Sequence, residues 1–193
     1  MTREDLIRQI EYYVPFNEQE SIDKEIILDK IRNVADIFDR TNLTEHITAS
    51  AWVVNKDRDK VLMVYHNIYN SWSWLGGHAD GEIDELSVAL REVKEESGVA
   101  IVKPVDENIF SLEILTVDGH VKKGKYVPSH LHLNLTYLLE ADENELLRIK
   151  ADENSGVSWF FLDEAIEKST EEWFKENIYS KLNKKLELLK ATK

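Results

Sequence analysis

The spacing of apolar residues predicts two helices at the start of the chain. Leu6, Ile7 and Ile10 share one face of a short helix that Val14-Pro15 ends. A second amphipathic helix is indicated by apolar residues at three- and four-residue steps, namely Ile22, Ile26, Ile27, Ile31, Val34 and Phe38. Neither helix carries a cluster of reactive side chains. We therefore expect residues 1–43 to form a helical extension that covers the main domain or contributes to a dimer contact.

After about residue 44 the pattern changes to the short apolar runs that are typical of strands. Residues 47–54 and 60–65 are rich in β-branched and aromatic side chains, and the polar segment 55–59 between them predicts a hairpin. A helix is predicted over about 84–97, where Gly98 ends it. Further strands are predicted at 100–102, 109–117, 130–139 and 157–161.

A charged amphipathic helix is predicted to close the chain. Its apolar stripe consists of Trp173, Phe174, Ile178, Leu182 and Leu189. Strands that alternate irregularly with helices favour an α+β fold, in which a mixed β-sheet is covered by helices on both faces.

Composition narrows the class of protein. The chain has 193 residues, of which 42% are hydrophobic, so it can bury the core of one domain and carry a modest extension. It has no cysteine, which excludes disulfides, thiolate zinc sites and cysteine nucleophiles. The N-terminus is charged from its first residues, and no stretch approaches a membrane span in length and apolarity. We expect a soluble cytoplasmic protein without a membrane partner.

The charge balance bears on the partners of the protein. The formal net charge is −13, from 37 acidic and 24 basic residues. Such an excess of negative charge repels phosphate backbones and argues against a nucleic-acid partner. An anionic protein that acts on an anionic small molecule also needs a local source of positive charge, and a bound divalent cation is the simplest one.

Three glutamates on the helix predicted over 84–97 could hold such a cation. Glu92, Glu95 and Glu96 are three or four residues apart and project within an arc of roughly 100°. The adjoining arc is apolar and should face the core, with Leu86, Ala89, Leu90 and Val93. A divalent cation would turn the repulsion between the carboxylates into coordination, and oxygen ligands favour Mg²⁺ or Mn²⁺ over zinc. An acidic cluster taken alone is more often a solvated helix face.

The surrounding residues favour the metal site, because the segment 77–99 resembles the signature of the Nudix hydrolases. That signature combines a glycine, a glutamate six residues later, an Arg-Glu-apolar-x-Glu-Glu block and a final x-Gly-apolar. The matching positions are Gly77, Arg91, Glu92, Val93, Glu95, Glu96, Gly98 and Val99. A match with one miss arises by chance on the order of once in ten million windows. The resemblance extends over about 47–167.

One position departs from this signature. The first glutamate of the family falls on Ile83, which Glu82 and Asp84 flank, and Leu75 stands where the family commonly has proline. A neighbouring acid could replace the missing glutamate, whose family role is to brace the loop against Arg91. Two alternatives therefore stay open, an active hydrolase and a catalytically impaired nucleotide-binding or regulatory module. An isomerase of the same fold is disfavoured because that branch uses a cysteine.

The resemblance also implies roles for individual residues. Glu92, Glu95 and Glu96 would bind Mg²⁺, or Mn²⁺, together with the main-chain carbonyl of Gly76. The catalytic residues would be Glu95, Glu96 and Arg91. Glu95 or Glu96 is the expected general base, with Glu153 as a weaker alternative. Arg91 would pair with Glu82, Asp84 or Glu95, and Gly77 and His78 would contact the substrate.

The fold and activity implied by the resemblance are those of the family. We expect a Nudix-type α/β/α sandwich over 44–193, preceded by the helical extension 1–43. The expected enzyme is a pyrophosphohydrolase that acts on acid anhydrides. Water would attack phosphorus in the diphosphate linkage of a nucleoside diphosphate joined to another moiety. A homodimer through the outer helices is an alternative to a monomer.

Several other polar and aromatic residues have two interpretations each. His130, His132 and Asn134 alternate along a predicted strand and point to one face, where they contact substrate or a metal, or form a half-exposed sheet surface. Trp72, Trp74 and Tyr126 could stack on a base, although aromatic residues near a core more often pack there.

Overall fold

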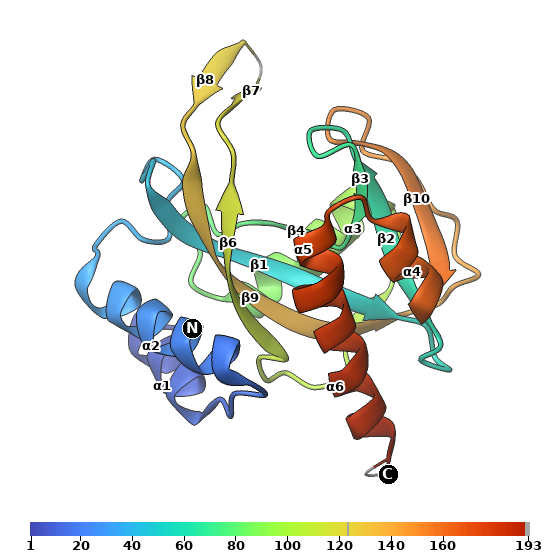
Figure 1. Ribbon diagram of the computed structural model, residues 1–193, viewed down its shortest axis with the longest axis horizontal. Helices are drawn as coiled ribbons and strands as arrows, with labels where there is room; N and C mark the ends of the chain where they lie inside the picture. The colour runs from blue at the N-terminus through green and yellow to red at the C-terminus, as the bar shows by residue number, and fades with distance from the viewer. Residues whose placement is uncertain (123, 192–193) are drawn as a thin grey trace. The chain divides into compact units, whose positions relative to one another are not determined.

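The computed structural model describes residues 1–122 and 124–191, which form two compact units (Figure 1). Unit 1 consists of Met1–Ser50, Gly76–Ala89 and Glu107–Tyr137, and unit 2 of Ala51–Leu75, Leu90–Asp106 and Leu138–Lys193. Strand β1 (Glu45–Val54), helix α3 (Glu85–Ser97) and strand β9 (His130–Ala141) begin in unit 1 and end in unit 2. The α+β class with a mixed sheet, predicted from the order of elements, is confirmed.

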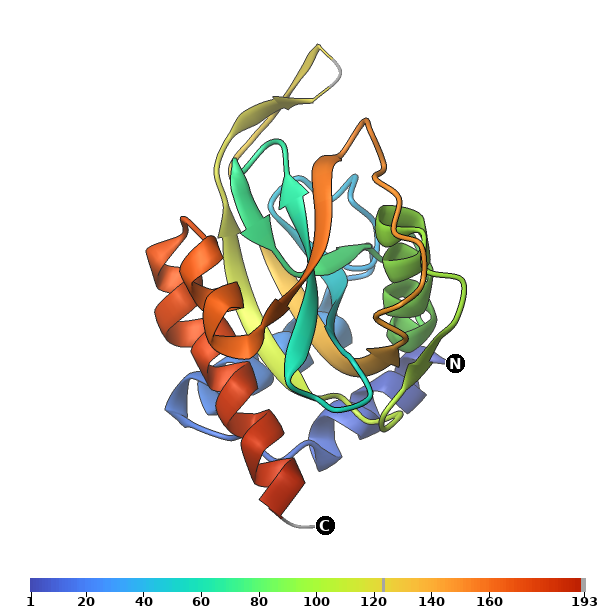
Figure 2. The same cartoon turned by 90° about the vertical axis from the view of Figure 1, so that its right-hand side faces the viewer.

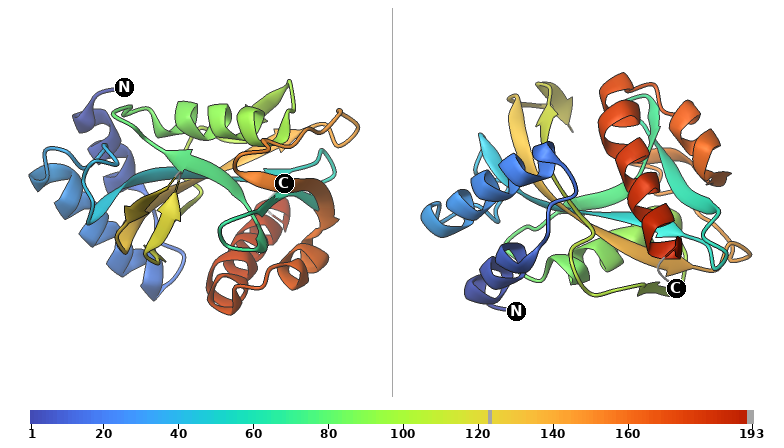
Figure 3. Two further views of the ribbon diagram at one scale, coloured as in Figure 1. Left: turned by 90° about the horizontal axis from the view of Figure 1, so that it is seen from above. Right: turned by 60° about the horizontal axis from the view of Figure 1, so that its bottom comes forward.

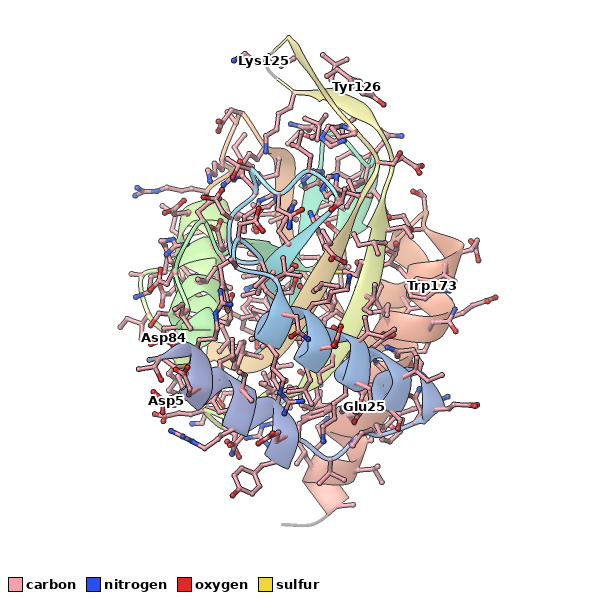
Figure 4. All side chains as sticks on the ribbon, turned by 90° about the vertical axis from the view of Figure 1, so that its left-hand side faces the viewer. Asp5, Glu25, Asp84, Lys125, Tyr126 and Trp173 are labelled. Atoms are coloured by element: carbon pink, nitrogen blue, oxygen red, sulfur yellow. The ribbon has the colours of Figure 1, made fainter. Side chains whose placement is uncertain are left out.

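The strands of unit 1 surround the first part of β9. Strand β6 (Ser111–Val117) pairs with β9 in antiparallel register, from Ser111 opposite Thr136 to Val117 opposite His130. Strand β1 lies on the other side of β9 and also pairs with β4 (Leu75–His78). Between β6 and β9 the chain forms a ribbon of β7 (His120–Lys122) and β8 (Lys125–Val127), and Figure 4 shows Lys125 and Tyr126 at its tip. Neither this ribbon nor β4 was predicted.

The two N-terminal helices of unit 1 pack on this sheet. Helix α1 (Arg3–Tyr12) begins with a capping box between Thr2 and Asp5, and α2 (Glu18–Asn33) begins at the cap Asn17. Both are blue in Figure 3. Helix α2 lies against β6, where Ile114 N–H donates to Asp23 Oδ2 over 3.0 Å. The extension is thereby hydrogen-bonded to a strand of unit 1.

Helix α2 ends earlier than the apolar pattern predicted. Val34 is its C-terminal cap with extended backbone, and Phe38 lies beyond it. The guanidinium of Arg3 donates to the carbonyls of Ile31, Val34 and Ala35 over 3.2, 3.2 and 2.7 Å. Because a side chain from α1 satisfies these terminal carbonyls, the helix can stop here without leaving them unpaired.

Unit 2 is built around strand β2 (Lys60–His66). Strand β10 (Asn154–Phe161) pairs with β2 in antiparallel register, and β3 (Ser71–Ser73) pairs with the end of β2. Helix α4 (Leu162–Lys168) packs on β10 and β2, as Figure 2 shows. The hairpin predicted around 55–59 is present, since Val54 of β1 lies opposite Val61.

Strand β5 (Val102–Pro104) pairs with the end of β9, two residues later than predicted. The Glu145 carboxylate explains the shift, because it accepts the N–H groups of Ala100 and Ile101 over 2.6 and 3.2 Å. Those two residues therefore cannot use the same N–H groups in the sheet.

The helix predicted to close the chain is interrupted. Helices α5 (Glu172–Phe174) and α6 (Ser180–Ala191) are joined by a π-helical turn, η1 (Lys175–Tyr179). In a π turn the hydrogen bonds join residues five apart instead of four. The extra residue rotates the apolar face of the helix that follows. Ile178 and Leu182 are buried as expected, whereas Trp173 and Leu189 are 49% and 42% exposed. Among the described residues, no helix has the length and apolarity needed to cross a membrane.

Candidate active site

Helix α3, which carries the acidic motif, has well-defined ends. At its start, Asp84 accepts the Ser87 N–H with its carboxylate over 3.3 Å and the Val88 N–H with its carbonyl over 3.0 Å. At its end, Gly98 has φ of +76°, and its N–H donates to the Lys94 carbonyl over 3.0 Å. The Asp84 carboxylate thus caps the helix. The predicted boundaries of this helix are confirmed.

The three motif glutamates differ in exposure. Glu96 is buried, the side chain of Glu92 is 14% exposed and that of Glu95 is 47% exposed. They therefore span the border between the buried and the solvated face, as their spacing predicted. The apolar face is centred differently from the prediction, because Val88, Ala89 and Val93 are buried while Leu86 and Leu90 are only half-buried.

A lysine lies among the acidic side chains of unit 2. Lys150 Nζ is 3.2 Å from Glu95 Oε2 and 2.8 Å from Glu153 Oε2. Burial lowers the pKa of Lys150, but hydrogen bonds to Glu153 and Glu95 raise it by more. The net pKa is above its usual value, so the ammonium stays charged. We call Glu92, Glu95 and Glu153 the acidic cluster. A cation, the Lys150 ammonium, already lies among these carboxylates.

Electrostatic repulsion within the acidic cluster is visible at Glu92. Burial raises the pKa of Glu92, the charges of Glu95 and Glu153 add to the rise, and Lys150 and Arg91 oppose it. Arg91 Nη2 lies 3.6 Å from Glu92 Oε1, a pairing that the motif had not suggested. Carboxylates that repel one another and offer only oxygen atoms fit Mg²⁺ or Mn²⁺ by their chemistry.

Asn154, at the start of β10, positions this cluster. Its Nδ2 donates to the Glu96 carbonyl over 3.0 Å, and its Oδ1 accepts the Lys150 N–H over 3.1 Å. One buried amide thus ties the end of α3 to the turn that carries Lys150 and Glu153. The motif contains no signal for Asn154. The strand predicted nearby begins only at residue 157, so Asn154 was not singled out.

The glycine pair predicted to approach the metal belongs to unit 1, with His78. A Cβ on Gly76 would lie 2.5 Å from the Ala49 carbonyl oxygen and 2.7 Å from Ser50 Oγ. The pairing of β4 with β1 therefore requires glycine at position 76 for a reason that the motif did not indicate. The participation of Gly76, Gly77 and His78 in metal or substrate binding stays a prediction.

The alternating residues of β9 divide into two groups. Asn134 is buried, its Oδ1 accepts the hydroxyls of Thr48 and Ser50 over 3.0 and 2.8 Å, and its Nδ2 donates to Glu113 over 3.0 Å. It therefore has a structural role within the sheet. His130 and His132 instead meet other imidazoles of unit 1, including His46, which sequence reasoning did not single out.

The three aromatic candidates for base stacking have ordinary environments. Trp72 contacts Tyr65 and Phe160 edge to face, and Trp74 contacts Tyr179 in the same way. These tryptophans pack within unit 2. Tyr126, on β8, is 73% exposed.

Comparison with known proteins gives concordant results. The family described as the NUDIX domain matches residues 44–182. A protein named "Probable DHNTP pyrophosphohydrolase" from Lactococcus lactis subsp. cremoris (strain MG1363) is 30% identical over 145 residues, which cover 74% of this chain and 81% of that protein.

Two solved structures are similar in fold. The binary complex of a C. elegans Ap4A hydrolase has a TM-score of 0.54 at 19% identity and covers 75% of this chain and 98% of its own. A NUDIX-family hydrolase from Clostridium perfringens has a TM-score of 0.50 at 25% identity and covers 75% of this chain and 97% of its own.

Proposed function

Because the chain belongs to the Nudix family, whose domain matches residues 44–182, we propose that it is a Mg²⁺-dependent hydrolase of a substituted nucleoside diphosphate. The family predicted from the motif is confirmed, and with it the class of enzyme, a Nudix-type pyrophosphohydrolase. The proposed reaction is attack of water on phosphorus in the diphosphate linkage that joins the nucleoside diphosphate to another moiety.

The proposed need for a metal ion rests on one observation. The Lys150 ammonium lies among the carboxylates of unit 2, so this position attracts a cation. Glu92, Glu95 and Glu96 would hold the divalent ion. When bound, such an ion neutralises phosphate oxygens and lowers the pKa of water. Lys150 would then turn away from Glu95, because two cations cannot share one small group of carboxylates at low cost.

Two carboxylates of the acidic cluster are candidates for the general base. Glu95 is the most exposed of the three motif glutamates, so a water molecule can reach it directly. Glu153 shares Lys150 with Glu95, which makes it a stronger candidate than its place in an acid-rich loop suggested. Arg91 would act as a positioning residue by holding the Glu92 carboxylate.

The substrate proposal has two sources of support. The Lactococcus lactis relative is named for DHNTP, and the C. elegans structure for Ap4A, and both names describe phosphoanhydrides. The alternative, an impaired nucleotide-binding module, rests on Ile83 in place of the family's glutamate. The acidic cluster argues against this alternative, because a binding module gains nothing from carboxylates that repel one another.

A turnover screen tests the proposal. The full chain would be incubated with DHNTP, Ap4A, nucleotide sugars and nucleoside triphosphates, with Mg²⁺ or with EDTA, and products separated by anion-exchange chromatography. We expect cleavage of at least one phosphoanhydride with Mg²⁺ and none with EDTA. Reaction in ¹⁸O-water should place the label on a phosphate product. Tight binding of a substrate without turnover would instead support the regulatory module.

A further inference from the structure

Four imidazoles of unit 1 lie together. The ring centroids of His46 and His130 are 4.9 Å apart, those of His46 and His132 5.0 Å, and those of His130 and His132 4.9 Å. His78 lies 5.1 Å from both His46 and His132. β9 supplies two of the rings, β1 the third and β4 the fourth.

Main-chain carbonyls orient two of these rings. His46 Nδ1 lies 3.0 Å from the Asn42 carbonyl oxygen, and His130 Nδ1 lies 2.8 Å from that of Pro128. A carbonyl only accepts hydrogen bonds, so in each neutral ring Nδ1 carries the hydrogen and Nε2 the lone pair, which in His130 lies at hydrogen-bond distance, 3.1 Å, from His132 Nε2. Metal-binding histidines are held by the same arrangement in proteins generally.

The lone pair of His46 is otherwise unused. His46 is 3% exposed, and its Nε2 is buried without a hydrogen-bond partner among residues 1–122 and 124–191. A buried polar atom without a partner is costly unless the fold uses it. A bound ligand that uses the Nε2 lone pair would explain why the His46 ring is held in this orientation.

The spacing of the nitrogen atoms suits a single metal ion. His130 Nε2 and His132 Nε2 are 3.1 Å apart, and one ring nitrogen from each of His46, His130 and His132 lies within 4.8 Å of the other two. Two nitrogens bound tetrahedrally at about 2.0–2.1 Å are about 3.3 Å apart. The pair on β9 is therefore nearly at ligand spacing, and His46 would have to move toward it for all three rings to bind one ion.

We propose that His46, His130 and His132 bind one divalent transition-metal ion, with Zn²⁺ the best fit, and leave a fourth position open to water or an anionic oxygen. Three imidazoles and no carboxylate favour Zn²⁺ over Mg²⁺, the reverse of the preference of the α3 glutamates. The site does not depend on the proposed hydrolase activity.

Cobalt titration of the full chain tests this site. The untagged protein, stripped with a chelator, would be titrated with Co²⁺ and followed by visible absorption. We expect one Co²⁺ per chain to show the intense bands of a four-coordinate ion, which Zn²⁺ displaces fully and excess Mg²⁺ does not, whereas Co²⁺ on the α3 glutamates would be six-coordinate and weakly absorbing. His46→Gln and His132→Gln should each weaken binding by about tenfold or more. His120→Gln, outside the three, is the matched control and should bind as the wild type does.

Further arms separate this site from the acidic cluster and from misfolding. The variant Glu95→Gln/Glu96→Gln should keep Co²⁺ binding unchanged, and circular dichroism would verify that each variant is folded. The proposal is overturned if wild-type protein gives only six-coordinate spectra, if Mg²⁺ displaces Co²⁺, or if the glutamate variant abolishes binding. It is likewise overturned if folded His46→Gln and His132→Gln bind as tightly as His120→Gln. The two tests on wild-type protein and the test on the glutamate variant are decisive even if the histidine variants fail to fold.

Discussion

Two regions of this molecule bring glutamates together, and they stabilise them in different ways. In unit 1, Glu20 and Glu113 are fully buried and surrounded by neutral donors. Glu20 accepts from the Tyr13 hydroxyl over 2.5 Å and from the Phe16 N–H over 2.7 Å. In unit 2, the acidic cluster is partly solvated and held chiefly by the Lys150 ammonium.

The difference separates an acidic group that serves the fold from one that fits the proposed metal site. Ser111 Oγ lies at hydrogen-bond distance from both Glu20 and Glu113 and can donate its one hydrogen to either, and Thr136 Oγ1 donates to Glu113 over 2.8 Å, so the partners named here are uncharged hydroxyls. Such a network ties α2 to β6 and has little reason to bind an ion. A carboxylate whose partner is a flexible lysine can exchange that partner for a metal.

The largest effect is expected from removing charge in the catalytic region. Glu95→Gln or Glu96→Gln should lower kcat by about a thousandfold, the range lost with a general base or a metal ligand. Steady-state kinetics on a substrate from the turnover screen would measure this. Glu187→Gln, on the exposed face of α6, is the control and should keep the wild-type rate. Wild-type rates in both α3 variants would refute the site assignment.

Removing a glutamate from the buried network should affect stability instead. Glu113→Ala removes the carboxylate that accepts from Asn134 and Thr136, while Ser111 can still donate to Glu20. We expect the free energy of unfolding to fall by about 3 kcal/mol, measured by urea titration. Glu113→Gln keeps the shape and one acceptor oxygen, so its loss should be smaller. Equal losses in the two variants would show that Glu113 acts through its full carboxylate, because the glutamine keeps the shape and one acceptor oxygen.

A smaller change should come from removing the cation of the acidic cluster. Lys150→Met eliminates the ammonium that competes with a divalent ion for Glu95 and Glu153. We expect Mg²⁺ to bind about fivefold more tightly, in keeping with the modest strength of a partly exposed ion pair. Calorimetric titration would measure this, with Lys184→Met on α6 as control. Weaker Mg²⁺ binding in Lys150→Met would mean that the lysine supports the metal site.

An effect of similar size concerns the imidazoles of unit 1. Burial lowers the pKa of His78 to about 2, and the positive charges of Arg40 and Lys122 act in the same direction. The unfolded chain takes up this proton near pH 6.5, so it binds more protons than the folded chain below that pH. Stability should therefore decrease as pH falls.

Between pH 7.5 and 5.5 this group should cost the folded protein about 1 kcal/mol. Urea titrations of the chelator-treated protein at both pH values would measure the loss. His78→Gln cannot take up the proton, so its stability should change less over the same interval. An identical pH dependence in wild type and variant would exclude His78 as the source.

Local patterns were sufficient for the elements whose partners are close in sequence. Helix α3 agrees with its prediction because its cap Asp84, its stop at Gly98 and its apolar face all lie within one short segment. Strands β1, β2, β6, β9 and β10 agree for the same reason, since β-branched and aromatic runs bounded by polar turns indicate them. Helix α2 and strand β5 disagree because Arg3 and Glu145, distant in sequence, take over their backbone groups.

The sequence by itself determined the family, the helix that carries the acidic motif and the order of Glu92, Glu95 and Glu96 along it, because helical periodicity is a local property. Only the tertiary structure decided that Lys150, Glu153 and Asn154 join that motif, and that His46 meets His130 and His132. The physical reason is that strand pairing and helix packing place side chains together across long loops, and no periodicity along the chain encodes those contacts.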